Sequence, residues 1–261
     1  MSDTKNERTS ELVVSQIEDS VATIMLNRPD KLNAMNVELL QSMLRALREA
    51  ASNEVVRVVI ITGSGRAFSA GGDLSEGDEA WGSLFSEDVL KLRELMEASE
   101  LLVEMPKVTI AAINGPCAGG ALALACAADL RYSATSAVFT TAFAKVGLTG
   151  DYGGTWTLPR VVGPAKAREL YLLSERFDAN EALRIGLVSQ VLADEDLMPH
   201  TRSIAKQLAT VPSGVISGIK NNLDDGLRLP LSQLLDREAE RQVRAARAPE
   251  RSRIDSNRHQ K

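Results

Sequence analysis

Hydrophobic and polar positions alternate along the first 63 residues in a way that predicts strands and helices in turn. Residues 11–18 and 21–27 are apolar at alternate positions, which favours two strands joined by the polar pair Asp19-Ser20. Residues 36–52 instead have apolar side chains at helical spacing, with Asn36 placed to cap the helix. Residues 56–63 form a nearly continuous β-branched run, typical of a strand buried on both faces.

The same alternation continues to about residue 134 and then changes. Residues 107–114 and 129–134 are predicted as strands, and the alanine-rich segment 119–128 between them as a helix. Strands that alternate with helices favour parallel pairing and right-handed crossovers, so the sequence predicts an α/β fold. After about residue 150 the pattern is mainly helical, with predicted helices at 164–174, 179–187, 194–210 and 229–246.

Composition and charge exclude several classes of protein. The 261 residues carry a formal net charge of −5, which argues against a basic surface for nucleic acid or acidic lipid. No uncharged apolar run reaches the length of a membrane span, and the polar start resembles no signal peptide, so we expect a cytoplasmic protein without membrane association. The two cysteines, Cys117 and Cys126, lie in an apolar run and are expected to be buried and reduced.

Two glycine-rich turns follow predicted buried strands and are the first candidates for chemistry. The turn after residue 62 lacks the third glycine of the dinucleotide-binding fingerprint, because Phe68 stands there, and it has no Walker lysine. What remains is Ala70-Gly71-Gly72-Asp73, a backbone free to approach a ligand closely. In the second turn, Gly119 and Gly120 begin a helix whose unpaired N–H groups attract negative charge. Tight packing alone would also explain these glycines.

The titratable residues narrow the chemistry further. The two histidines, His200 and His259, lie in the polar C-terminal part, far from both turns, and are interpreted as surface residues. A Ser-His-Asp catalytic triad, a Cys-His catalytic dyad or a histidine-rich metal site is therefore not expected. Any acid–base catalysis must come from carboxylates.

Taken together, the motifs of the chain resemble those of the crotonase (enoyl-CoA hydratase/isomerase) superfamily over about residues 10–245. Five ordered segments carry the resemblance, namely residues 27–35, 61–74, 111–134, 150–163 and 165–191. The resemblance implies a crotonase-like spiral of ββα units over residues 1–197, which holds the acyl-CoA site. It implies a helical region over residues 198–261 that forms trimers, often paired into hexamers. The implied ligand is an acyl-CoA thioester, with no metal or redox cofactor.

The resemblance also assigns roles to individual residues. The N–H groups of Gly72 and Gly120 match the family's oxyanion hole, which stabilises the negative charge that develops on the thioester oxygen. Arg28 and Lys31 are candidates for binding the CoA phosphates, although either one could equally be a solvated charge at a turn. The CoA channel is expected to be lined by Ala34, Ala70, Gly71, Asp73 and Leu74.

Departures from the family pattern change the expected mechanism. Enoyl-CoA hydratases carry two glutamates that position and deprotonate water, but here Ala123 and Phe143 occupy those places. Residues 139–160 contain one carboxylate, Asp151. An aspartate stands in the matching turn of dienoyl-CoA isomerases, epoxyacyl-CoA isomerases and a chlorobenzoyl-CoA dehalogenase. Asp151 could instead simply cap the helix that follows it.

The leading hypothesis is an isomerase that shifts a double bond or ring of an acyl-CoA, with Asp151 moving the proton. One base suffices for such a shuttle, and the ring of Phe143 would keep the pocket dry and strengthen the base. Tyr152, Trp81 and Phe85 are weaker candidates for the acyl pocket. The alternatives are a hydratase or hydrolase that uses Asp151 and an ordered water, or a non-catalytic acyl-CoA-binding homologue. The end of the chain lacks the phenylalanine that commonly contacts CoA in family members. The resemblance therefore does not assign residues to the adenine end of the CoA site.

Overall fold

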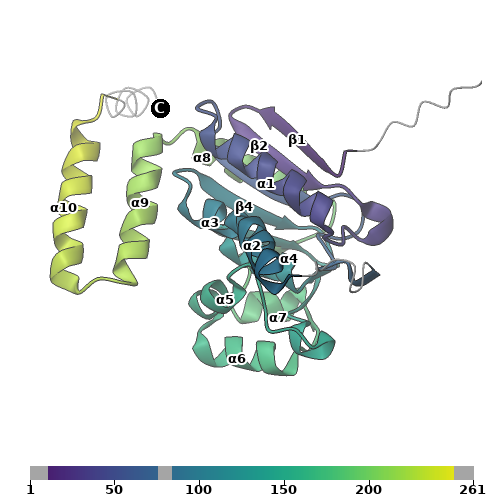
Figure 1. The fold of residues 1–261 in the computed structure, drawn as a ribbon. Helices are drawn as coiled ribbons and strands as arrows, with labels where there is room; N and C mark the ends of the chain where they lie inside the picture. Colours follow the sequence, from purple (N-terminus) through teal and green to yellow (C-terminus); the bar gives the residue numbers. More distant parts are fainter. Residues whose placement is uncertain (1–10, 76–83, 250–261) are drawn as a thin grey trace, which may run out of the picture.

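A six-stranded sheet forms the centre of the molecule in the computed structural model, which describes residues 11–75 and 84–249 (Figure 1). Its strand order is β1-β2-β3-β4-β6-β9, and every neighbouring pair is parallel except β1 and β2. The bounds of these strands are Val13–Glu18, Val21–Leu26, Val58–Gly63, Val108–Ile113, Leu130–Ala134 and Gln190–Leu192. The predicted parallel α/β arrangement is confirmed.

Hydrophobic clusters cover both faces of this sheet. Residues of β3 and β4 are buried throughout, and they alternate between the two clusters because successive side chains of a strand point to opposite faces. On one face pack α1 (Val37–Ser52), α3 (Glu97–Glu104) and α4 (Gly120–Ala127). On the other face packs α8 (Leu197–Ala209). Asn36 caps α1 as predicted, since its side chain accepts a hydrogen bond from Leu39 N–H.

A second, much smaller sheet lies beside the first. It contains β5 (Cys117–Ala118), β7 (Val138–Thr140) and β8 (Phe177–Asp178). Single parallel bridges, Ser69 to Cys117 and Met35 to Gly72, extend it toward the start of the chain. Successive turns of the chain therefore each add one long strand to the first sheet and one short extended segment to the second, which is the expected spiral.

The remaining helices surround the end of this second sheet or lead away from the body. They are α2 (Phe85–Leu95), α5 (Gly154–Val162), α6 (Pro164–Leu173), α7 (Ala179–Arg184), α9 (Ser213–Gly226) and α10 (Leu231–Arg247), with short 3₁₀ turns η1 (Pro29–Lys31) and η3 (Phe143–Val146). None of the described helices is long and apolar enough to cross a membrane.

Helices α9 and α10 form a two-helix arm that stands apart from the body (Figure 1). No residue described in either helix is fully buried. The arm is attached through Lys220 of α9, whose Nζ donates to the carbonyls of Met105 and Lys107 and to Asp129 Oδ2 at 2.9 Å. The predicted boundary at residue 197 coincides with the first residue of α8, which packs on the sheet, so the arm itself begins at α9.

One expectation from the sequence is met only in part. His200 was predicted at the surface, but it is half-buried: its ring packs edge-on against Tyr132 with 5.1 Å between ring centroids, and its Nε2 is buried. His200 lies on the α8 face that covers the sheet, and this placement depends on packing that the local sequence does not reveal. Cys117 and Cys126 are free and buried, as expected.

Candidate active site

The first glycine turn is held in place by backbone hydrogen bonds to the segment 32–35. Ala70 N–H donates to Leu32 O at 2.9 Å, Met35 N–H to Gly71 O at 2.8 Å, and Asp73 N–H to Met35 O at 3.1 Å. Gly72 is exposed, and within the described part of the chain its N–H has no acceptor. The turn therefore presents an unpaired donor at the surface of a rigid backbone.

The second glycine turn lies directly against the first. Gly71 has a φ of 91° and approaches Ala118 so closely that a Cβ on Gly71 would lie 2.8 Å from Ala118 O. Gly119, with a φ of 54°, is the N-cap of α4, and Gly120 is the first helical residue. The N–H of Gly120 has no acceptor among the described residues, as expected for the first turn of a helix. Two unpaired donors thus come from adjoining segments, and α4 adds the positive end of its dipole.

Asp151 is the carboxylate that the fold brings to these donors. Its Oδ1 lies 2.9 Å from the position that a Cβ on Gly120 would occupy. This oxygen is buried and has no hydrogen-bond partner among the described residues. Burial raises the pKa of Asp151 to about 6, and a hydrogen bond from its own N–H opposes the shift only partly. A carboxyl group with such a pKa is suited to accept and return a proton near neutral pH.

The alternative role of Asp151 as a helix cap does not match the geometry. The N-cap of α5 is Gly153, and no side chain caps that helix. Asp151 contributes only its backbone carbonyl, which accepts from Gly154 N–H at 3.1 Å. The backbone on both sides of Asp151 is unusual, with φ values of 112° at Gly150, 48° at Tyr152 and 69° at Gly153. A non-glycine residue at positive φ is strained, and such strain tends to gather at functional sites.

Apolar side chains occupy the two places where hydratases have glutamates. Ala123 is buried in α4, and its Cβ packs against Gly154. The ring of Phe143 is buried beside Gly119 and Gly150 and stacks on Tyr171, with 6.0 Å between ring centroids. Neither residue offers a charge or a hydrogen bond at the place where a hydratase has a glutamate.

Two residues at this site were not predicted from the sequence. The Cε of Met35 lies 3.1 Å from the Cβ position of Gly120, so Met35 connects the two glycine turns. The hydroxyl of Tyr171 lies against Gly154, which it approaches from α6. Met35 adjoins the predicted channel residue Ala34 and could have been inferred from that proximity. Tyr171 could not have been inferred, because in the sequence it is one apolar position of a predicted helix and belongs to no motif.

The residues predicted to bind CoA lie along the edge of the first turn. Arg28 Nη1 donates to Ala34 O at 2.6 Å and to Asp73 Oδ2 at 2.9 Å. Hydrogen bonds from Ser75 and from Arg28 lower the pKa of Asp73, so this aspartate is ionised at neutral pH. Lys31, Ala70 and Leu74 are exposed, whereas Ala34 and Gly71 are buried. The Nη1 of Arg28 thus braces the turn, and phosphate binding by Arg28 or Lys31 stays a prediction.

Two of the three weaker aromatic candidates, Trp81 and Phe85, gain no support. Trp81 lies outside the described residues. Phe85 is the first residue of α2 and is 85% exposed, so its ring lines no closed pocket. Within the described ranges, no group of three histidine, cysteine, aspartate or glutamate side chains is placed to hold a metal ion.

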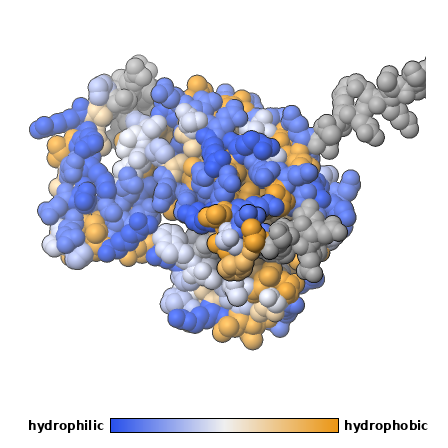
Figure 2. Space-filling view, viewed as in Figure 1, coloured by the Kyte–Doolittle hydropathy of each residue, from blue (hydrophilic) through white to orange (hydrophobic). Residues whose placement is uncertain are grey.

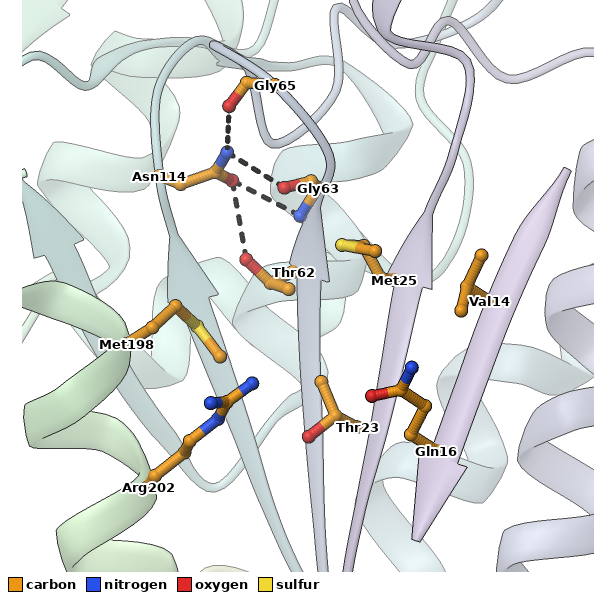
Figure 3. A pocket seen from close by; sticks show the side chains of 10 residues that line it. All are labelled: Val14, Gln16, Thr23, Met25, Thr62, Gly63, Gly65, Asn114, Met198 and Arg202. Carbon is orange, nitrogen blue, oxygen red and sulfur yellow. Dashed lines mark hydrogen bonds between the residues drawn. The ribbon is translucent and has the colours of Figure 1, made fainter. Parts of the chain in front are cut away.

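A separate pocket of about 270 Å³ opens on the α8 face of the sheet and is distinct from this site (Figure 3). Its walls include Met25, Thr62, Met198 and Arg202. Asn114 also lines the pocket, but its side-chain amide forms hydrogen bonds with Thr62, Gly63 and Gly65. Asn114 therefore stabilises the turn that follows β3. The described residues that line the pocket include no carboxylate or histidine, and we assign it no catalytic role.

A spiral of ββα turns with paired backbone donors beside a buried carboxylate defines a class of enzyme that stabilises an oxyanion next to a base. The comparisons with known proteins agree with this class. Residues 16–253 match the family model described as enoyl-CoA hydratase/isomerase, and the chain belongs to that family. It is thus an enzyme of the crotonase type.

Individual relatives have different activities in their names. The chain is 39% identical over 224 residues to a probable enoyl-CoA hydratase of Rhodobacter capsulatus, covering 86% of this chain and 85% of the relative. It is 35% identical over 239 residues to 1,2-epoxyphenylacetyl-CoA isomerase of Escherichia coli, covering 91% of each. The crystal structure of an enoyl-CoA hydratase from Bacillus anthracis superposes with a TM-score of 0.88 at 27% identity, covering 96% of this chain and 97% of that one. The family and the fold are therefore shown, and the reaction has to be argued from the site.

Proposed function

We propose that this enzyme is an acyl-CoA isomerase that shifts a double bond or a ring through a thioester enolate. The observation that carries the proposal is the buried, unpartnered carboxylate oxygen of Asp151 beside Gly120. The thioester oxygen would accept hydrogen bonds from the N–H groups of Gly72 and Gly120. These bonds stabilise the negative charge that forms on this oxygen when the acyl chain loses a proton and becomes an enolate.

Asp151 would remove that proton and return it to another carbon. Its pKa of about 6 leaves it mostly ionised at neutral pH and still basic enough to take a proton from carbon next to a stabilised enolate. The returned proton completes the isomerisation, so no atom is gained or lost. The proposed chemistry needs the carboxylate and the two N–H groups, without a further cofactor.

Hydration is disfavoured by the walls of the site. Two glutamates position water in the hydratases, and here Ala123 and Phe143 supply no hydrogen bond to a water molecule at those places. The similarity to the epoxyphenylacetyl-CoA isomerase also supports a reaction that rearranges the acyl group.

Mass spectrometry of the reacted thioesters tests this proposal. A panel of 2-enoyl-, 3-enoyl- and ring-containing acyl-CoAs is incubated with the enzyme in H₂O and, in parallel, in D₂O. We expect a product of unchanged mass in H₂O and uptake of deuterium in D₂O, because Asp151 exchanges protons with solvent between removal and return. A gain of one water would establish hydration instead, and release of free CoA would establish hydrolysis.

We also propose that the chain assembles as a homotrimer or a pair of trimers through the α9–α10 arm. The arm exposes Ile219, Leu223, Leu227, Leu231, Leu235 and Val243, although its helices have few contacts with the body. In the view of Figure 2 most of the arm's surface is hydrophilic, with isolated apolar positions between the charged ones. An arm with this many exposed leucines is best explained by a partner chain that covers them.

Analytical ultracentrifugation of variants tests whether the arm, rather than another surface, forms the interface between subunits. Changing Leu231 and Leu235 to glutamate is expected to convert a trimer or hexamer into monomers, because both side chains are more than half exposed in the single chain. Val55→Glu is the matched control, since Val55 is 62% exposed and lies outside the arm, in the loop that follows α1. A monomeric wild type, or an unchanged oligomer after the double substitution, would contradict the assignment.

A further inference from the structure

The hydroxyl of Tyr152 is a buried polar group that the proposed proton shuttle does not use. Tyr152 is 2% exposed, and its hydroxyl has no hydrogen-bond partner among the described residues. Native proteins rarely leave a buried hydroxyl unpaired, and each such group calls for an explanation, such as a ligand that completes it.

The fold holds this tyrosine beside the reacting centre. The Cδ2 of its ring lies 3.2 Å from the Cβ position of Gly120, next to Asp151 Oδ1. Its φ of 48° is strained, and its backbone carbonyl accepts a hydrogen bond from Ser99 Oγ of α3 at 2.7 Å. The surrounding structure therefore holds Tyr152 in a backbone conformation that is unfavourable for a non-glycine residue. Such strain often occurs at functional sites, so we ask what Tyr152 does.

Two consecutive residues thus each carry a buried polar atom without a partner. Asp151 Oδ1 and Tyr152 Oη are both buried, and neither has a hydrogen-bond partner among the described residues. Burial and the charge of Asp151 raise the pKa of Tyr152, so its hydroxyl is protonated throughout the neutral range and can donate. A hydrocarbon acyl chain would leave this donor unpaired, whereas an acyl oxygen would accept its hydrogen bond.

We propose that Tyr152 is a specificity-determining residue whose hydroxyl donates a hydrogen bond to an oxygen carried by the acyl group. The enzyme then favours acyl-CoA thioesters with a hydroxyl, carbonyl or ring oxygen over hydrocarbon chains of the same length. This inference rests on the proposed function, because it requires the acyl group to lie beside Gly120 and Asp151. A site that binds a substrate oxygen discriminates against the analogue that lacks it, since the buried donor is then left unpaired.

Calorimetric binding of non-reacting thioesters to the full chain tests the inference. The probes form two matched pairs: butyryl-CoA with 3-hydroxybutyryl-CoA, and phenylacetyl-CoA with 2-hydroxyphenylacetyl-CoA. In at least one pair the wild type is expected to bind the hydroxylated member more tightly. Tyr152→Phe should weaken binding of that member about tenfold, the size expected for one lost hydrogen bond, and should leave its hydrocarbon partner unchanged.

Two comparisons separate this role from a purely structural one. Tyr132→Phe removes a hydroxyl from β6 on the opposite face of the sheet and should change neither pair. Retained binding of the hydrocarbon thioester shows that the Tyr152→Phe protein is folded, and its melting temperature should equal or exceed that of the wild type, because an unpaired buried hydroxyl has been removed.

The possible failures are distinguishable. Equal weakening of both members of a pair, or no change in either, would overturn the role of Tyr152 while leaving the acyl-CoA site intact. A wild type that prefers neither hydroxylated thioester would overturn it as well. A wild type that binds none of the four thioesters would overturn the proposed function and this inference together.

Discussion

Asp151→Asn is expected to lower kcat for isomerisation by about 10²–10⁴-fold, the usual contribution of a positioned general base. The amide has nearly the shape of the carboxylate, so the packing around Gly120 is kept and acyl-CoA should bind with unchanged affinity. Rapid-quench turnover and calorimetric binding measure the two quantities separately. Asp178→Asn is the matched control, because Asp178 is an exposed aspartate that caps α7 and asparagine caps a helix equally well.

The pKa of Asp151 predicts how activity depends on pH. Because the base must be ionised, kcat/KM of the wild type should fall as the pH is lowered through about 6. The residual activity of Asp151→Asn should lack this fall. A pH profile that is flat between 5 and 8 in the wild type, or unchanged turnover in the variant, would refute Asp151 as the base.

The same pKa predicts that the variant is more stable than the wild type. An aspartate has a pKa near 3.9 when unfolded, and here burial raises it to about 6 in the fold, so folding disfavours the charged form. This destabilisation is absent below about pH 4, grows between pH 4 and 6, and is complete above pH 6. At about 1.4 kcal/mol per unit, Asp151→Asn should gain at most about 3 kcal/mol at pH 8 and nothing below pH 4, measurable by urea unfolding.

Gly120→Ala is expected to lower kcat by about 10²–10³-fold, comparable to the loss of one oxyanion donor. The N–H remains, but the added methyl group would lie 2.9 Å from Asp151 Oδ1, 3.1 Å from Met35 Cε and 3.2 Å from Tyr152 Cδ2. These side chains must move, and the base and the donor then lose their mutual geometry. Steady-state kinetics on the substrate found by mass spectrometry would measure the loss.

Two other glycines make the comparison specific. Gly214→Ala places a methyl group in α9 with no atom within 4 Å and should leave kcat unchanged. Gly72→Ala also meets no atom of the described residues within 4 Å, so a loss of kcat/KM there is expected to report a clash with the bound thioester. Full activity of Gly120→Ala would show that the oxyanion does not lie beside this residue.

Much of the sheet could be predicted from the sequence because its strands are long and buried on both faces. The strands predicted at 56–63 and 107–114 are observed at 58–63 and 108–113, and the strand predicted at 21–27 ends one residue earlier. Helices α5 and α9 were not predicted. α5 begins at Gly154 and contains Pro159, and α9 begins after Pro212 and contains Gly214, so both lack the usual signals of a helix.

The site could be predicted only in part. The positions of Gly72, Gly120 and Asp151 were predicted from motif resemblance, and the structure brings Gly120 and Asp151 into contact. The second sheet was not predicted, because strands of two or three residues are too short to show a period. The unpaired state of Asp151 and Tyr152 could not be predicted either, because it depends on contacts between segments distant along the chain.

The bridge between Met35 and Gly72 has a consequence for how such an enzyme can diversify. Both proposed oxyanion donors are main-chain groups, so exchanging one side chain for another does not delete either of them. The proposed base, by contrast, is a single side chain on a separate turn, and a one-nucleotide change can remove or replace it. New reactions can therefore arise by mutation around residue 151 while activation of the thioester is inherited with the fold.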